Sequence, residues 1–177
     1  MDYHQCQRVD NLKEFGLQVI SEFRLRRGKT IGEEIEHNLQ WLEHGGWDQI
    51  KSAFGELKNN NDKKVEKKWA EYLIGSDDVT KTKMLKGIGP KQSRNLLQSL
   101  GLTRYEIPLD SRIIKWLHGI GFPLHLSGNA LADRHYYNFV LDGFQRLCSE
   151  CDIFPCVLDA AIFSSMDQEW RVDKIIW

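Results

Sequence analysis

Long apolar runs are absent from this 177-residue chain, and its first residues, Met-Asp-Tyr-His-Gln, lack the apolar stretch of a secretory signal peptide. A membrane-spanning helix needs about 20 consecutive, mainly apolar residues, and no segment here approaches that length. Charged residues make up 28% of the chain, which is typical of a soluble protein. We therefore expect an intracellular protein, in the cytoplasm, the nucleoid or the nucleus, with no membrane partner.

Cysteine is also scarce, with four in the whole chain. Three of them, Cys148, Cys151 and Cys156, lie close together and raise the question of a metal or iron–sulfur site. Such sites normally take four protein ligands, and the remaining Cys6 is far away in the sequence. We therefore favour ordinary reduced thiols and predict no metal site at these cysteines.

Strand patterns are missing as well: no segment keeps up an alternation of apolar and polar residues, and no Asn-Gly or Asp-Gly turn links two such segments. Apolar residues recur instead at helical spacing, as at Ile31, Ile35 and Leu39. The pattern predicts an all-α fold, a single compact bundle of about eight to ten helices. We expect one domain over 1–177, with a helical N-terminal part (1–75), a hairpin and catalytic segment (76–118) and a helical C-terminal part (119–177).

The charge is distributed unevenly along the chain. The net charge is −1, yet residues 81–118 carry eight basic and two acidic side chains, a net +6, so the rest of the chain carries −7. A concentration of positive charge of this kind is typical of a surface that binds phosphates. The alternative is a solvated basic face that binds nothing.

A glycine-rich turn lies inside this basic segment. Leu-Lys-Gly-Ile-Gly (85–89) joins two predicted helices, and Pro90 suits the first turn of the second one. The free N–H groups at that helix start form an anion site suited to a DNA phosphate. By itself, this helix-hairpin-helix pattern is equally compatible with a non-catalytic grip on the DNA backbone. The residues expected to contact the DNA backbone are Lys86, Gly87, Gly89, Gln92, Arg94 and Arg112.

Two residues near the hairpin point to catalysis. Lys91 opens the second hairpin helix, and Asp110 follows nineteen residues later, after Pro-Leu and before another predicted helix. This arrangement resembles the helix-hairpin-helix DNA glycosylase superfamily, and within it the compact 8-oxoguanine DNA glycosylase/AP lyases. The resemblance covers about residues 60–170 and implies an active site in a cleft beside the hairpin, with Lys91 as nucleophile and Asp110 assisting it.

The chemistry suits these residue types. A neutral lysine amine can attack the deoxyribose C1′ and form a Schiff base, and a carboxylate can stabilise the positive charge that grows on the sugar. The alternative roles are a further phosphate contact for Lys91 and a plain helix N-cap for Asp110.

The C-terminal part adds a candidate base pocket. The segment around Asp159 and Phe163 is similar to the last helix of the same enzymes, in which an aromatic ring stacks on the flipped-out base and a polar residue one turn earlier reads its Watson–Crick edge. The two residues are four apart and therefore share a helical face. Trp177 is a third candidate for this pocket.

The expected function is base-excision repair: removal of an oxidised purine, 8-oxoguanine above all, by a glycosylase with AP-lyase activity. The alternatives are the same scaffold acting on another damaged or modified base, a non-catalytic helix-hairpin-helix DNA-binding module, and a helical protein–protein adaptor. The expected partner is double-stranded DNA with a damaged base, bound by a monomer. No organic cofactor is implied, although the hairpin can hold a structural cation on the backbone carbonyls of Leu85 and Ile88, as relatives do.

Overall fold

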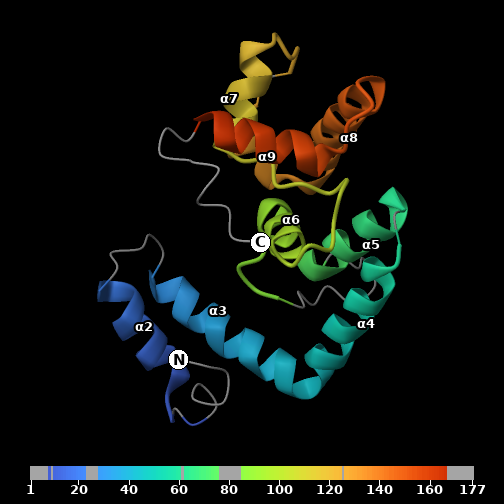
Figure 1. Cartoon of the computed structure of the whole chain (residues 1–177). Coiled ribbons are helices and arrows are strands. Elements are labelled where there is room, and N and C mark those ends of the chain that lie inside the picture. The colour runs from blue at the N-terminus through green and yellow to red at the C-terminus, as the bar shows by residue number, and fades with distance from the viewer. Residues whose placement is uncertain are drawn as a thin grey trace. The chain divides into compact units, whose positions relative to one another are not determined.

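The computed structural model describes residue 8 and residues 10–22, 28–60, 62–75, 85–124 and 126–166. Over these residues the chain forms helices and loops and no strand, which confirms the all-α class (Figure 1). In the same part of the chain, no helix is both long enough and apolar enough to cross a membrane.

The chain divides into two compact units, whereas the sequence predicts a single bundle. Unit 1 comprises residues 1–55 and 72–88, and unit 2 comprises residues 56–71 and 89–177. The boundaries at 55/56 and 71/72 fall inside two helices, so each of these helices has one end in unit 1 and the other in unit 2. Apolar periodicity along the sequence cannot reveal such a division. Every residue of the candidate active site belongs to unit 2.

Unit 1 is built around two helices near the N-terminus, α2 and α3, which contact each other and lie side by side in Figure 1. A kink with π-helical hydrogen bonding separates α3 from α4, and Gly45 adopts a φ of 102° within it. The elements that unit 1 contains wholly or in part are α2 (Leu12–Glu22), α3 (Gly28–Trp41), η1 (Leu42–Gly46), α4 (Trp47–Lys58) and the last residues of α5 (Lys63–Ile74).

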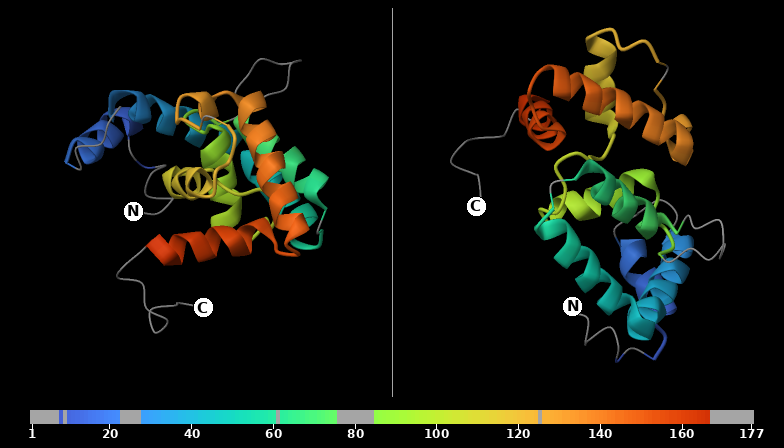
Figure 2. Two further views of the ribbon diagram at one scale, coloured as in Figure 1. Left: turned by 90° about the horizontal axis from the view of Figure 1, so that it is seen from above. Right: turned by 90° about the vertical axis from the view of Figure 1, so that its right-hand side faces the viewer.

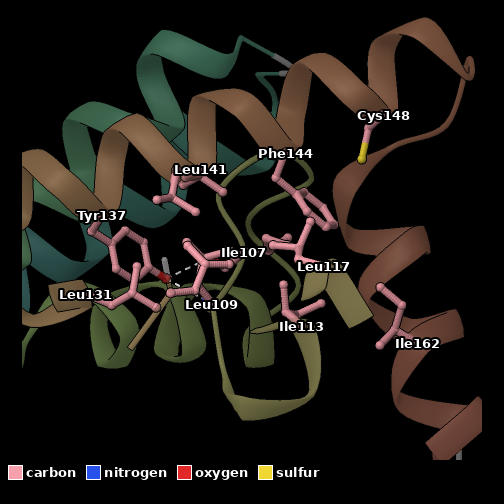
Figure 3. Packing of buried hydrophobic residues seen from close by; sticks show 12 residues of the cluster. Ile107, Leu109, Ile113, Leu117, Leu131, Tyr137, Leu141, Phe144, Cys148 and Ile162 are labelled. Atoms are coloured by element: carbon pink, nitrogen blue, oxygen red, sulfur yellow. Dashed lines mark hydrogen bonds between the residues drawn. The ribbon is translucent and has the colours of Figure 1, made fainter. Parts of the chain in front are cut away.

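Among the described residues, unit 2 holds an apolar core in which α7, α8 and α9 contact one another directly or through the core (Figure 2). Leu117, Phe144 and Ile162, one from each of these helices, are at most 3% exposed and face the same interior (Figure 3). Beyond its shares of α4 and α5, unit 2 contains α6 (Pro90–Ser99), α7 (Ser111–Gly119), η2 (Ala130–Ala132), α8 (Arg134–Glu150) and α9 (Pro155–Met166).

The helix limits in unit 2 follow local signals in the sequence. Pro90 occupies the first turn of α6, as predicted, and Gly101 takes a φ of 69° just after its end. Asp110 caps the N-terminus of α7. At the other end of α7, Gly121 has a left-handed φ of 78° two residues after the helix ends.

A buried arginine organises the interior of unit 2. Arg94, on α6, is 0% exposed, and its guanidinium donates to Glu106 (Nε–Oε2 2.9 Å), Glu71 (2.7 Å) and Asn138 (2.9 Å). The guanidinium carbon of Arg94 also lies 4.9 Å from the ring centroid of Tyr137. Because Arg94 is sealed inside the protein, the prediction that it contacts the DNA backbone is wrong.

The segment that leads to Asp110 is held by two further buried side chains. The Glu66 carboxylate accepts three backbone N–H groups, from Arg104, Tyr105 and Glu106, at 2.8–2.9 Å. These bonds satisfy loop N–H groups that would otherwise be buried without an acceptor. The path of the chain before α7 is therefore defined from α5.

Tyr137 continues this support up to the residue before Asp110. Its hydroxyl accepts from the N–H of Leu109 (2.7 Å) and donates to the carbonyl of Ile107 (3.0 Å), as the dashed lines in Figure 3 indicate. Burial raises the pKa of this phenol far above its usual range, so the hydroxyl stays protonated and keeps its donor role.

Replacing Arg94 should destabilise the fold rather than weaken DNA binding. Arg94→Ala leaves the carboxylate of Glu106 buried without its cation, which is expected to lower the free energy of unfolding by about 3–5 kcal/mol. Urea denaturation followed by circular dichroism measures this change. The matched control is Lys115→Ala on the exposed side of α7, for which a change within about 0.5 kcal/mol is expected. An Arg94→Ala protein as stable as the control would contradict the structural role of the network.

Candidate active site

A pocket of about 270 Å³ lies in unit 2 where α6, the start of α7 and α9 face one another. It brings together the residues that the sequence proposes for catalysis, Lys91 and Asp110, with those proposed for the base, Asp159 and Phe163. Its wall carries two cationic and two carboxylate side chains, so their charges balance and the pocket suits a ligand of low net charge. The lining residues are Lys91, Asn95, Gln98, Ser99, Pro108, Asp110, Arg112, Asp159 and Phe163.

The α6 wall of the pocket follows from helical spacing. Lys91, Asn95 and Gln98 are separated by four and three residues and so lie along one face of the helix. The opposite face is buried, with Arg94 and Leu97 at 0% and 3% exposure. Burying that face therefore turns Lys91 toward the pocket.

The Lys91 side chain is exposed and lines the pocket entrance from the first turn of α6. Gly89 occupies the N-cap position of this helix and has no side chain to accept a hydrogen bond from the first-turn N–H groups. Lys91 and Gln92, in the same turn, are exposed. The predicted phosphate contacts of Gly89 and Gln92 stay predictions.

Asp110 combines the two roles that the sequence left open, since it caps α7 and lines the pocket. Its Oδ1 accepts from the N–H groups of Arg112 (2.8 Å) and Ile113 (3.1 Å). Its Oδ2 accepts from the guanidinium of Arg112, with an Nε–Oδ2 distance of 2.7 Å. Partial burial raises the pKa of Asp110, but these hydrogen bonds outweigh it and lower the pKa below its usual range. The carboxylate is therefore ionised at neutral pH.

Arg112 lies inside the pocket and bridges two of its walls. In addition to its bonds with Asp110, its guanidinium carbon lies 4.0 Å from the ring centroid of Phe163, on α9. Its side chain is 42% exposed. The sequence predicts Arg112 as a DNA-backbone contact; the structure gives it two partners inside the protein and leaves part of it open to solvent.

Asp159 lies one helical turn before Phe163 and is tied to α6. Gln98 donates from Nε2 to Asp159 Oδ2 at 2.7 Å, while the other amide atom, Oε1, is buried and has no hydrogen-bond partner among the described residues. Burial raises the pKa of Asp159; the bond from Gln98 lowers it in part, and the nearby Asp110 raises it further. Gln98 and Asn95 were not singled out from the sequence, although their helical spacing from Lys91 was the available signal.

The hairpin loop itself, within unit 1, is held by α3. The Asn38 side chain donates to the carbonyl of Lys86 (3.0 Å) and accepts from its N–H (2.8 Å). The carboxylate of Glu34 lies against the Cα of Gly87, in the space that a Cβ would fill. Glu34 therefore leaves no room for a side chain at Gly87, and the predicted phosphate contact of Gly87 and the predicted cation at the carbonyls of Leu85 and Ile88 stay predictions. The part played by Asn38 and Glu34 had no signal in the sequence.

The clustered cysteines and Trp177 complete the predicted sites. Cys148 is buried, Cys156 half-buried and Cys151 exposed. Burial raises the pKa of Cys148 to about 11, so it is a neutral thiol at neutral pH. Among the residues that the structure describes, no group of three or more His, Cys, Asp or Glu side chains is placed to hold a metal ion. Trp177 lies outside the described residues.

Comparisons of the chain with known proteins return no matching family model, no matching curated protein and no matching solved structure. What the pocket does must therefore be argued from its own residues.

Gly87 should be more sensitive to substitution than a glycine with the same backbone conformation in open space. Gly87 and Gly101 have φ values of 77° and 69°, but only Gly87 has a side chain against its Cα. The left-handed conformation costs an alanine about 1–2 kcal/mol at either site, and Gly87→Ala should cost more because of the collision with Glu34. Thermal unfolding of both variants measures the difference. In a Glu34→Ala background, Gly87→Ala should destabilise the protein no more than Gly101→Ala does. If Gly87→Ala stays more destabilising in that background, Glu34 is not the cause.

The two roles of Asp110 should separate in variants. Asp110→Ala removes the cap and should lower the free energy of unfolding by about 1–2 kcal/mol at pH 7, whereas Asp110→Asn keeps an acceptor oxygen and should retain most of the stability. Since the folded protein lowers the pKa of Asp110, its charge stabilises the fold above the usual carboxyl range and loses this effect as the pH falls through the folded pKa. The difference between the wild type and Asp110→Ala should therefore shrink in acid.

Urea denaturation between pH 7 and pH 3 follows this change. A difference that stays constant over the whole range would mean that the carboxylate charge contributes nothing to the cap.

Proposed function

We propose that this protein is a DNA glycosylase with AP-lyase activity, which removes a damaged purine through a Schiff base on Lys91. The observation that supports the proposal most is the composition of one pocket: a lysine from the start of α6, an ionised aspartate at the start of α7, and an aspartate–phenylalanine pair on α9. These are the groups needed for nucleophilic attack, stabilisation of sugar charge and recognition of a base.

The base side of the pocket suits a flipped nucleobase. Phe163 is 39% exposed and offers a ring for stacking, and Asp159 offers carboxylate oxygens to the N–H groups of a base edge. A purine is neutral, in keeping with the balanced charges of the wall. We propose 8-oxoguanine as the substrate, on the strength of the resemblance, and the alternative substrate is another damaged or modified base.

The sugar side of the pocket suits the bond changes of excision. Once Lys91 has given up its proton to solvent, its amine attacks C1′ while the C1′–N bond breaks; the electron pair of that bond leaves with the base, which takes up a proton. Positive charge develops on the sugar as that bond lengthens, and the Asp110 carboxylate stabilises it because hydrogen bonds keep this group ionised. Opening of the sugar ring then leaves an iminium on Lys91.

Strand cleavage follows from the same intermediate. Loss of a C2′ proton allows the C3′–O bond to break, so that the 3′ phosphate departs, and hydrolysis of the iminium returns Lys91 to its amine form. The protein supplies the nucleophile and the charge stabilisation, and the reaction needs no oxidant, reductant or organic cofactor.

Borohydride trapping tests the proposal. Borohydride reduces the iminium to a stable amine, so a labelled duplex with a single 8-oxoguanine should become covalently attached to the wild type. Lys91→Ala should lose the adduct and slow excision by about 10³-fold or more, because the nucleophile is gone. Lys115→Ala, which removes an exposed lysine outside the pocket, should trap normally.

Parallel duplexes with an abasic site and with undamaged guanine separate the alternatives. Adducts on the abasic duplex alone would keep Lys91 as a lyase and point to another base as substrate. Normal excision by Lys91→Ala would refute the proposal. The absence of any adduct from a folded, DNA-binding protein would favour a non-catalytic helix-hairpin-helix module instead.

A further inference from the structure

The Phe163 ring, on which a flipped base would stack, is already in contact with the side chain of Arg112. Arg112 places its guanidinium carbon 4.0 Å from the centroid of Phe163 while forming two hydrogen bonds to Asp110 Oδ2. All three residues line the pocket, and the guanidinium lies over one face of the Phe163 ring. A base cannot stack on that ring face while the guanidinium lies over it.

We propose that Arg112 is an exchangeable occupant of the base pocket: the entering base takes its place on Phe163 and, by doing so, releases Asp110 for catalysis. This inference rests on the proposed glycosylase function and assigns to Arg112 the role of a positioning and selectivity residue. It links base entry to activation of the carboxylate through one side chain.

The strengths of the contacts permit this exchange. A partly exposed ion pair and a partly exposed cation–π contact each shift an equilibrium by about fivefold or less. Stacking of a nucleobase on an aromatic ring shifts one by about 5- to 150-fold. A base that stacks well can therefore displace Arg112, whereas one that stacks poorly or is held firmly in the duplex cannot.

The two oxygens of Asp110 make release possible without loss of position. Oδ1 stays bound to the N–H groups of Arg112 and Ile113 at the start of α7, so the carboxylate keeps its place when the guanidinium leaves. Oδ2 then loses its counter-charge and can stabilise the sugar cation. The freed guanidinium, whose side chain is already 42% exposed, becomes available for a DNA phosphate.

Two variants separate the exchange from a simple phosphate contact. Arg112→Lys keeps the positive charge but lacks the planar fork that bonds Asp110 and stacks on Phe163. Arg112→Gln removes the charge as well. Neither changes the backbone N–H groups that Asp110 caps, and unfolding curves establish that both variants fold.

Single-turnover excision is measured on duplexes with 8-oxoguanine and with undamaged guanine. If a base must displace Arg112 to enter the pocket, Arg112→Lys should raise the excision rate of undamaged guanine, relative to that of 8-oxoguanine, by about fivefold or more. The dependence of its DNA affinity on salt should stay that of the wild type. Unchanged selectivity in Arg112→Lys would overturn the proposal. Equal losses of excision rate on both duplexes in both variants would overturn it as well, because such losses are expected of a residue that only contacts the DNA.

The pH profile gives a second readout that a merely structural residue would not change. The charged groups that share the pocket with Asp110 are Lys91, Arg112 and Asp159. Without the guanidinium, the pKa of Asp110 should rise, and the acid limb of kcat/KM should move to higher pH in Arg112→Gln. An acid limb that stays in place would show that Arg112 does not control this carboxylate.

Nuclear magnetic resonance observes the exchange directly and without chemistry. In a Lys91→Ala background, the Arg112 Nε–H signal should shift when a duplex with 8-oxoguanine is added and much less with an abasic duplex, which has no base to insert. A signal that responds equally to both duplexes would overturn the exchange. This outcome differs from failure of the proposed function, in which no duplex forms a borohydride adduct with the wild-type protein.

Discussion

The ion pair between Arg94 and Glu106 is the interaction on which the candidate active site depends. It joins the buried face of α6 to the segment that runs into Asp110, and the same guanidinium also binds Glu71 on α5 and Asn138 on α8. With that face of α6 fixed inward, Lys91 is turned toward the pocket. Buried charges of this kind are costly to desolvate and are tolerated only when their hydrogen bonds are satisfied, so the arrangement admits few alternatives.

In the pocket built on this support, each carboxylate has a hydrogen-bond partner. Asp110 is held ionised by Arg112 and by the N-terminus of α7, and Asp159 is held by Gln98. Lys91 stays exposed, where an incoming duplex can reach it. For the proposed excision of a neutral purine, in which charge develops only in the transition state, such a wall would hold the stabilising groups already in position.

Local features of this protein could be predicted from the sequence, and features that depend on neighbours could not. The helix starts at Pro90 and Asp110 follow from the backbone chemistry of those residues, and the i, i+4 spacing places Asp159 and Phe163 on one face. Arg94 was predicted on the DNA side because an arginine beside a basic hairpin looks exposed. Its acidic partners lie 23 and 12 residues away in the chain, and sequence spacing does not show that they meet.

The sequence by itself determined that this protein is helical and which residues begin α6 and α7, because each of these depends on interactions within a few residues. It suggested Lys91 and Asp110 for lysine-based chemistry only through a resemblance. Only the tertiary structure decided that Lys91, Asp110, Asp159 and Phe163 line one pocket, that Arg112 bridges it, and that the chain divides into two units. These outcomes depend on which faces are buried against one another, and burial is a property of the packed chain rather than of any local segment.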